Sequence, residues 1–345
     1  MTMTVNTVQA KELIIDCLES KLVPMITGSP GGGKSALVSQ IAQDFNLKVI
    51  DMRLSQCDPT DLLGFPKVTG DRAEYIPMIT FPLEGDSLPT DSSNKPMNGW
   101  LLFLDEFNSA PLSVQAASYK LVLDRAVGVY NLHENVAVVC AGNKSTDNAI
   151  VNRMSTAMQS RMIHLELESD SNTWLDWAHQ NDIDFRVTSY INFKPNILNS
   201  FNPDHDDKTF PCGRTWEFMS RLISKWPTTI PDSKRALLAG TVGEGTAREF
   251  MGFCKVFQEL PTIAKIIGNP LVIQVPTEPS ILYAVSGTIS AHAETDNIAP
   301  LIQFVQRMPI EFQVITLQDA LKRNRSLLNE PSIKQWISDN AKELY

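Results

Sequence analysis

The sequence of 345 residues lacks paired cysteines, long apolar runs and an excess of positive charge. Its five cysteines are scattered and form no C-x-x-C pair, so neither a disulfide framework nor a zinc site is indicated. The 39 acidic residues outnumber the 30 basic ones, and the net charge of −9 disfavours a dedicated nucleic-acid surface. No leader-like segment opens the chain and no run approaches membrane-spanning length. We therefore expect a cytoplasmic protein with reduced thiols and no membrane contact.

A glycine-rich segment near the start of the chain has the pattern G-x-x-x-x-G-K-[ST] of a phosphate-binding loop. It lies between the apolar run Val23–Thr27 and a helical pattern that begins at Ser35. A strand, a glycine loop and a helix N-terminus direct backbone N–H groups toward one point, where nucleotide phosphates can bind. In this arrangement Lys34 would contact the β- and γ-phosphates, and Ser35 would ligate Mg²⁺. The predicted nucleotide-binding residues are Gly28, Ser29, Pro30, Gly31, Gly32, Gly33, Lys34 and Ser35.

Two acidic residues, Asp105 and Glu106, follow the apolar run Leu101–Leu104. If that run is a buried parallel strand, the acids lie at its carboxyl end, where open α/β sheets bind their ligands. Asp105 would then hold Mg²⁺, directly or through water, and Glu106 would act as the general base for the attacking water. Asn143 follows a second apolar run, Val138–Gly142, and could orient that water or contact the γ-phosphate. The sequence therefore predicts nucleotide hydrolysis with Glu106 and Asn143 as catalytic groups.

The segment after this second run indicates which nucleobase the protein binds. Asn143–Asp147 is similar to the guanine-binding N-K-x-D motif of small GTPases, but its Asp lies one residue too late. The strict spacing matters because the Asp must meet two donors of the base while Asn and Lys frame the ring. We therefore favour adenine over guanine, and ATP as the nucleotide.

Short apolar runs alternate with helical patterns through the first half of the chain, as is typical of a parallel sheet covered by helices. Strands are expected at Val23–Thr27, Leu47–Asp51, Trp100–Leu104, Val136–Cys140 and Met162–Leu167, and helices over residues 35–45, 113–124 and 152–161. Glycine, proline and small polar residues between Gly64 and Met97 predict a hairpin and a mobile loop. Past Asp170 apolar residues recur at helical spacing. The predicted fold class is α/β, with a nucleotide-binding core over residues 1–168, a helical lid over 169–260 and a C-terminal helical extension over 261–345.

These motifs, in this order, resemble those of the AAA+ ATPases and, within that family, of the MoxR-like branch. Gly28–Ser35 is similar to the Walker A motif, Leu101–Glu106 to Walker B and Asn143 to sensor 1. Asp58–Gly64 resembles the segment that precedes a hairpin insertion in this branch, and Asp105–Pro111 resembles its extended Walker B signature. The resemblance covers about the first 225 residues. It implies an AAA+ P-loop core followed by a mostly helical lid.

The resemblance also implies functional arginines. Arg161 matches the arginine finger, which reaches the ATP of a neighbouring subunit, and Arg153 is the alternative for that role. Arg214, within Cys212–Thr215, resembles sensor 2 and would contact the γ-phosphate of its own subunit. A finger supplied in trans stabilises charge that develops on the transferred phosphoryl group. The resemblance implies a homo-oligomeric ring, with six subunits as the expected number, and ATP and Mg²⁺ as cofactors.

MoxR-like relatives commonly act as chaperones that assemble or activate a protein with a metal-binding von Willebrand factor A domain. This chain contains no Asp-x-Ser-x-Ser metal motif of that kind, so such a partner would be a separate protein. We therefore expect an ATP-hydrolysing ring that remodels, assembles or activates a protein partner. Two alternatives stay open: a nucleotide-gated assembly scaffold, against which the intact Glu106 argues, and a nucleic-acid-stimulated motor, which the acidic charge disfavours.

Overall fold

The computed structural model describes residues 3–147, 151–200 and 208–340. The chain forms two compact units, Met1–Ser169 and Asp170–Tyr345, and each is described by itself. The first unit combines strands and helices, whereas the second consists of helices and connecting segments within its described residues.

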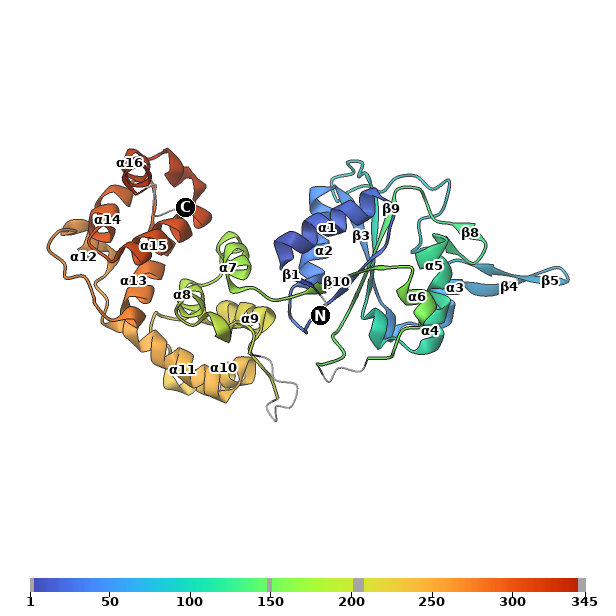
Figure 1. The fold of residues 1–345 in the computed structure, drawn as a ribbon, viewed down its shortest axis with the longest axis horizontal. Helices are drawn as coiled ribbons and strands as arrows, with labels where there is room; N and C mark the ends of the chain where they lie inside the picture. The colour runs from blue at the N-terminus through green and yellow to red at the C-terminus, as the bar shows by residue number, and fades with distance from the viewer. Residues whose placement is uncertain (1–2, 148–150, 201–207, 341–345) are drawn as a thin grey trace. The chain divides into compact units, whose positions relative to one another are not determined.

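A six-stranded parallel sheet in the order β1-β10-β2-β9-β6-β3 forms the centre of the first unit (Figure 1). The strand before the glycine-rich loop, β2, lies in the interior between β10 and β9. Near-continuous apolar sequence is what a parallel strand covered on both faces requires, and all five predicted strands are confirmed. The strands are β1 (Thr4–Val5), β2 (Pro24–Thr27), β3 (Leu47–Arg53), β6 (Gly99–Asp105), β9 (Val136–Gly142) and β10 (Ile163–Leu167).

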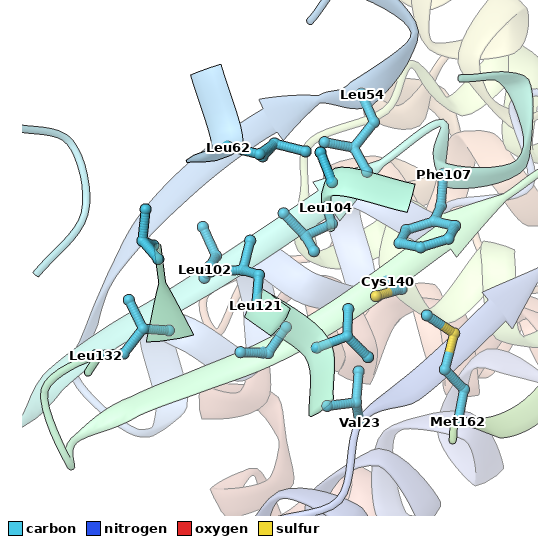
Figure 2. Close-up of a cluster of buried hydrophobic side chains, with 14 of the residues drawn as sticks. Val23, Leu54, Leu62, Leu102, Leu104, Phe107, Leu121, Leu132, Cys140 and Met162 are labelled. Atoms are coloured by element: carbon cyan, nitrogen blue, oxygen red, sulfur yellow. The ribbon is translucent and has the colours of Figure 1, made fainter. Parts of the chain in front are cut away.

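Helices pack on both faces of this sheet, because successive strand residues point to opposite sides. Leu101 and Val139 face the cluster formed with α1 (Thr7–Glu19) and α2 (Lys34–Asp44). Leu102 and Cys140, one residue further along, belong to the cluster on the other face (Figure 2). That second cluster is covered by α3 (Pro59–Leu63), α4 (Leu112–Ala117), α5 (Tyr119–Leu123) and α6 (Thr156–Gln159).

Two antiparallel hairpins interrupt the alternation of strands and helices. The predicted hairpin between Gly64 and Met97 consists of β4 (Phe65–Thr69) and β5 (Arg72–Ile76), and it projects away from the sheet (Figure 1). A shorter hairpin, β7 (Ala126–Val127) and β8 (Tyr130–Asn131), follows α5 and was not predicted from the sequence.

Two helix predictions need correction. The helix expected over residues 113–124 is broken into α4 and α5 at Ser118, whose hydroxyl donates to the carbonyl of Gln115 and competes with helical hydrogen bonding. Within residues 152–161 only α6 is helical, because Ser155 accepts a hydrogen bond from the Met158 N–H and so caps a helix that begins there. The helix α1, with Ala10, Ile14 and Cys17 buried along one face, was not predicted.

The second unit contains two hydrophobic clusters. The first surrounds Trp216 and Phe250, and the second surrounds Leu301 and Trp336. The helical character expected past Asp170 is confirmed, while the division at residue 260 stays a prediction. No helix in the described ranges combines the length and the apolarity needed to cross a membrane. The α-helices are α7 (Ser171–Gln180), α8 (Phe185–Phe193), α9 (Gly213–Ile223), α10 (Arg235–Val242), α11 (Glu244–Lys255), α12 (Ile263–Gly268), α13 (Pro279–His292), α14 (Ile298–Val305), α15 (Ile310–Arg323) and α16 (Pro331–Asp339).

Candidate functional site

The glycine-rich loop connects β2 to α2 at the carboxyl edge of the sheet. Gly33 occupies the N-cap of α2 with φ +88°, a backbone conformation that a residue with a Cβ rarely adopts. A Cβ on Gly32 would lie 3.0 Å from the carbonyl oxygen of Ser29, so the loop winds closely on itself. The N-cap offers no side-chain acceptor, which leaves the first N–H groups of α2 to an anion. The backbone of this loop is thus suited to phosphate binding, while the roles of the eight predicted residues stay a prediction.

Lys34 is buried beside this loop, with 9% of its surface exposed. Its Nζ donates to the carbonyl oxygens of Gly28 at 2.6 Å and Ser29 at 3.2 Å, and to Oδ1 of Asn143 at 3.3 Å. Phosphate oxygens are stronger acceptors for an ammonium group than these neutral oxygens. The structure therefore brings together two residues that the sequence proposed independently, Lys34 and Asn143, around an ammonium that an anionic ligand can engage.

Ser35 and Asp105 face each other across the loop, with 3.4 Å between Oγ and Oδ2. A hydroxyl and a carboxylate are the hard oxygen ligands that Mg²⁺ prefers, and the ion commonly takes its other ligands from phosphates and water. In the described residues no group of three or more His, Cys, Asp and Glu side chains is arranged to hold a metal. The two residues therefore fit an Mg²⁺ ion that arrives with a nucleotide, and do not form an all-protein metal cage.

Glu106 follows β6 as the N-cap of the short 3₁₀ helix Phe107–Ser109, and its φ of +55° is a left-handed backbone conformation that is uncommon for a residue with a Cβ. Its carboxylate accepts a hydrogen bond from the hydroxyl of Ser55, which lies in the short 3₁₀ helix Leu54–Gln56 after β3. Strained backbone of this kind persists where the surrounding structure holds it, often at functional sites. Sequence reasoning missed Ser55, because nothing local marks a serine that meets an acid 51 residues away.

Asn143 is held in place by Asn108, which has only 6% of its surface exposed. Asn143 N–H donates to Oδ1 of Asn108 at 3.0 Å, and Nδ2 of Asn108 donates back to the Asn143 carbonyl at 2.7 Å. A Cβ on Gly142 would lie 2.3 Å from the same Asn108 oxygen, so this close approach depends on glycine. Asn108 therefore fixes the backbone of Asn143 while the Asn143 side chain meets Lys34.

A third acid, Asp51, lies near the pair Asp105 and Glu106. Desolvation by the surrounding protein, followed by the negative charge of Asp105, raises the pKa of the Asp51 carboxyl, and the nearby Arg53 opposes the shift. Arg53 pairs in register with Asp105 across β3 and β6. From the sequence, Asp51 was expected only as the last residue of a strand. The edge of the sheet thus concentrates negative charge where a divalent cation would be stabilised.

The three candidate arginines lie on exposed positions. Arg161 lies two residues before β10; its guanidinium donates to the carbonyl of Ala157 and lies 5.7 Å from the ring centre of Tyr119. Arg153 is exposed upstream of α6. Arg214 is exposed in the first turn of α9, in the second unit. The roles of these arginines, and of the other site residues, stay predictions.

Comparison with known protein families gives one match. The model of the AAA domain (dynein-related subfamily) matches residues 24–162. This span contains the whole glycine-rich loop, both strand-end acids, Asn143 and Arg161. A comparison with curated protein sequences found no match.

Several solved structures align along most of the chain, at low similarity. An ATPase candidate from Cytophaga hutchinsonii is 13% identical, with a TM-score of 0.37 and coverage of 98% of this chain and 90% of that one. NtrX from Brucella abortus is 14% identical, with a TM-score of 0.34 and coverage of 100% and 69%. The replication initiator DnaA bound to AMPPCP and single-stranded DNA is 15% identical, with a TM-score of 0.33 and coverage of 99% and 95%. Likenesses at this level carry no argument about what the chain does.

Proposed function

Because residues 24–162 form a domain of the AAA+ ATPase family, we propose that the protein binds ATP with Mg²⁺ and hydrolyses it to ADP and phosphate. The observation that supports this most is the meeting of Lys34 and Asn143 beside the phosphate loop, with Ser35 facing Asp105. Lys34 would contact the β- and γ-phosphates. Ser35 and Asp105 would hold the Mg²⁺ ion, which supplies positive charge against the phosphates.

Glu106 is the proposed general base. In hydrolysis a water oxygen bonds to the γ-phosphorus, the bond from that phosphorus to the β–γ bridging oxygen breaks, and Glu106 accepts the proton that the water loses. Asn143 would orient the water. The hydrogen bond from Ser55 occupies the Glu106 carboxylate, so we infer that the described arrangement is a resting one. Turnover would require Glu106 to leave Ser55 and to face the water.

We also propose that the active form is a ring of identical subunits, with six as the expected number. Arg161, or Arg153 in its place, would reach the nucleotide of the neighbouring copy, which an exposed arginine can do. Arg214 would contact the γ-phosphate of its own subunit.

The proposed work of the ring is the MoxR-like one: to remodel, assemble or activate a protein partner, with a von Willebrand factor A domain protein as the leading candidate. The β4–β5 hairpin supports a protein partner, because it exposes large apolar side chains: Phe65, Val68, Tyr75 and Ile76. Val68 has 75% of its surface exposed. Clusters of exposed apolar side chains often mark interaction sites.

The first test is ATP hydrolysis per subunit as a function of protein concentration. A specific rate that rises steeply with concentration is expected, because a neighbouring subunit completes the site. Glu106→Gln should bind ATP yet hydrolyse it about 10²- to 10⁴-fold more slowly. Glu12→Gln, an exposed acid on α1, is the matched control and should retain full activity. A flat rate near zero, with ATP-dependent assembly, would favour the scaffold alternative.

A mixing experiment tests whether the arginine acts in trans. Arg161→Ala and Lys34→Ala subunits should each be inactive alone and regain part of the activity when mixed, because some interfaces then pair an intact loop with an intact arginine. The same experiment with Arg153→Ala separates the two candidates. Absence of recovery at every mixing ratio would assign Arg161 a role within its own subunit.

A further inference from the structure

A second site is suggested by a pocket of about 270 Å³ in the first unit, away from the phosphate loop. Leu47 and Val136, the first residues of β3 and β9, line it, together with Leu18 in the last turn of α1 and Leu22, three residues after that helix ends. Because the strands are parallel, this is the edge of the sheet opposite to the one that carries the glycine-rich loop. The volume lies just below the usual range for small-molecule sites, so it suits a ligand of few atoms.

Arg125 lines this pocket and is partly buried. Desolvation lowers the pKa of its guanidinium, and no neighbouring charge compensates the shift. Among the described residues, none forms a hydrogen bond, ion pair or ring contact with this side chain. None of its nitrogens is among the fully buried unpaired polar atoms of the described residues, so water solvates this guanidinium and an anionic ligand would take the place of that water.

Lys21 adds a second positive charge to the same pocket. Both bases have left-handed backbone, with φ +56° at Lys21 and φ +52° at Arg125. At Lys21 this is the C′ position of a Schellman motif that ends α1: the Leu22 N–H donates to the Cys17 carbonyl at 2.8 Å and the Lys21 N–H to the Leu18 carbonyl at 3.0 Å. Arg125 occupies the corresponding position after α5, whose C-cap is Asp124. The two helix ends thus bring both bases to one pocket.

The other polar groups of the pocket limit the chemical class of ligand that it can bind. Nδ2 of Asn98 donates to the Phe45 carbonyl at 2.8 Å, and Nδ2 of Asn135 donates to the Asn98 carbonyl at 3.1 Å, so each amide already uses one of its two N–H donors. Two exposed acids, Glu19 and Glu134, also line the pocket and offset the charge of Lys21 and Arg125, so the net attraction is too small to favour a multiply charged anion such as phosphate over a single carboxylate. A single negative charge on an apolar body is the best match.

We propose that this pocket binds a monocarboxylate that carries a small apolar group. The carboxylate pairs with Arg125 and Lys21, and the apolar group packs against Leu18, Leu22 and Leu47. A free branched-chain acid and the C-terminal leucine of a polypeptide present this same chemistry. The inference is independent of ATP hydrolysis.

Ligand-observed NMR titration of the full chain tests the proposal with three probes: 4-methylpentanoate, N-acetyl-leucine and the neutral N-acetyl-leucinamide. At least one of the two acids should bind with a dissociation constant on the order of 1 mM. The amide and inorganic phosphate should bind at least about tenfold more weakly. Tighter binding of 4-methylpentanoate identifies a free acid as the ligand, and tighter binding of N-acetyl-leucine identifies a chain end.

Arg125→Asn is the decisive variant, because asparagine tolerates left-handed backbone while it removes the charge. It should weaken binding of the acid at least about tenfold, and Arg125→Lys should retain part of it. Lys67→Asn, on the exposed β4–β5 hairpin, is the matched control. Equal binding of N-acetyl-leucine and its amide, or unchanged binding by a folded Arg125→Asn protein, would overturn the proposal.

Discussion

A buried cationic side chain has different hydrogen-bond partners in each of the two units of this chain. In the first unit, Nζ of Lys34 donates to the carbonyl oxygens of Gly28 and Ser29 and to the amide oxygen of Asn143. In the second unit, Arg186 is 3% exposed and pairs with Asp184 through two hydrogen bonds of 2.9 and 2.7 Å. Neutral oxygens give way to an anionic ligand more readily than a carboxylate does. The first arrangement suits binding, and the second suits a fixed structure.

The remaining hydrogen bonds of Arg186 support this contrast. Its guanidinium also donates to the carbonyl oxygens of Pro227, Thr228 and Ile223, so the segment after α9 is tied to α8. Fully satisfied buried networks of this kind rigidify a fold. The second unit therefore uses its buried charge to join helices.

The largest effect in this comparison is expected for Asp184→Asn. Asparagine keeps the N-cap of α8, so the change isolates the loss of the charge beside Arg186. Removal of one partner from a buried pair should destabilise the second unit by about 3–5 kcal/mol. Calorimetry and denaturant unfolding measure this loss, and Asp232→Asn, an exposed acid, is the control. A loss below about 1 kcal/mol would show that Arg186 does not need its carboxylate.

Lys34→Ala should have the next largest effect. This effect should be on ATP affinity and not on the free energy of unfolding. Loss of the ammonium should weaken ATP binding by about 2–4 kcal/mol, or roughly 30- to 1,000-fold, because phosphate charge loses its nearest cation. The free energy of unfolding without nucleotide should change much less than in Asp184→Asn. Titration with a fluorescent ATP analogue measures the affinity, with Lys48→Ala on the exposed edge of β3 as the control. An unchanged ATP affinity would show that the glycine-rich loop does not bind the nucleotide.

Ser55→Ala should have a smaller effect and in the opposite direction. Without the Ser55 hydroxyl, Glu106 loses the hydrogen bond that holds it in the resting arrangement. A hydrogen bond worth about 1 kcal/mol corresponds to a roughly fivefold rise in the basal rate of hydrolysis. Steady-state ATP turnover measures this rate, and Ser39→Ala, whose hydroxyl donates to the backbone carbonyl of Ser35 within α2, is the control. A fall in rate would mean that Ser55 holds Glu106 in its working position.

Local sequence features predicted the sheet and the loop well. Buried parallel strands are nearly continuous apolar runs, and the glycine pattern is fixed by backbone geometry, so both can be identified within a few residues. The break at Ser118 was missed because a serine side chain that donates to Gln115 interrupts an otherwise helical pattern.

Contacts between distant segments could not be predicted in the same way. The hydrogen bonds between Ser55 and Glu106 and between Asn108 and Asn143 form only because β3, β6 and β9 lie side by side. No spacing in the sequence encodes that these side chains face each other. The proposed arginine finger goes one step further, since its partner would lie on another copy of the chain.

The smallest expected effect is a change in the free energy of unfolding caused by a substitution at Asp51, in the first unit. The pKa of the Asp51 carboxyl is higher in the folded protein than in the unfolded chain, so the native state binds a proton more tightly. The stability that this proton contributes is lost as pH rises through the folded-state pKa. At pH 7 the charged Asp51 therefore costs stability, and Asp51→Asn should raise the free energy of unfolding by about 0.3 kcal/mol, a small value because solvent screens this exposed side chain. The gain should shrink below about pH 4, where aspartate becomes protonated.

Unfolding measured across pH tests this effect, with Asp71→Asn in the exposed hairpin as the control for loss of one surface charge. The charge of Asp105 contributes to the shift, so Mg²⁺ with ATP should narrow the gap between Asp51→Asn and the unaltered protein. Asp184→Asn should show no such response to Mg²⁺, because its missing charge lies in a structural pair. A gap at Asp51 that is unaffected by Mg²⁺ and ATP would mean that the negative charge at this edge of the sheet does not serve the ion.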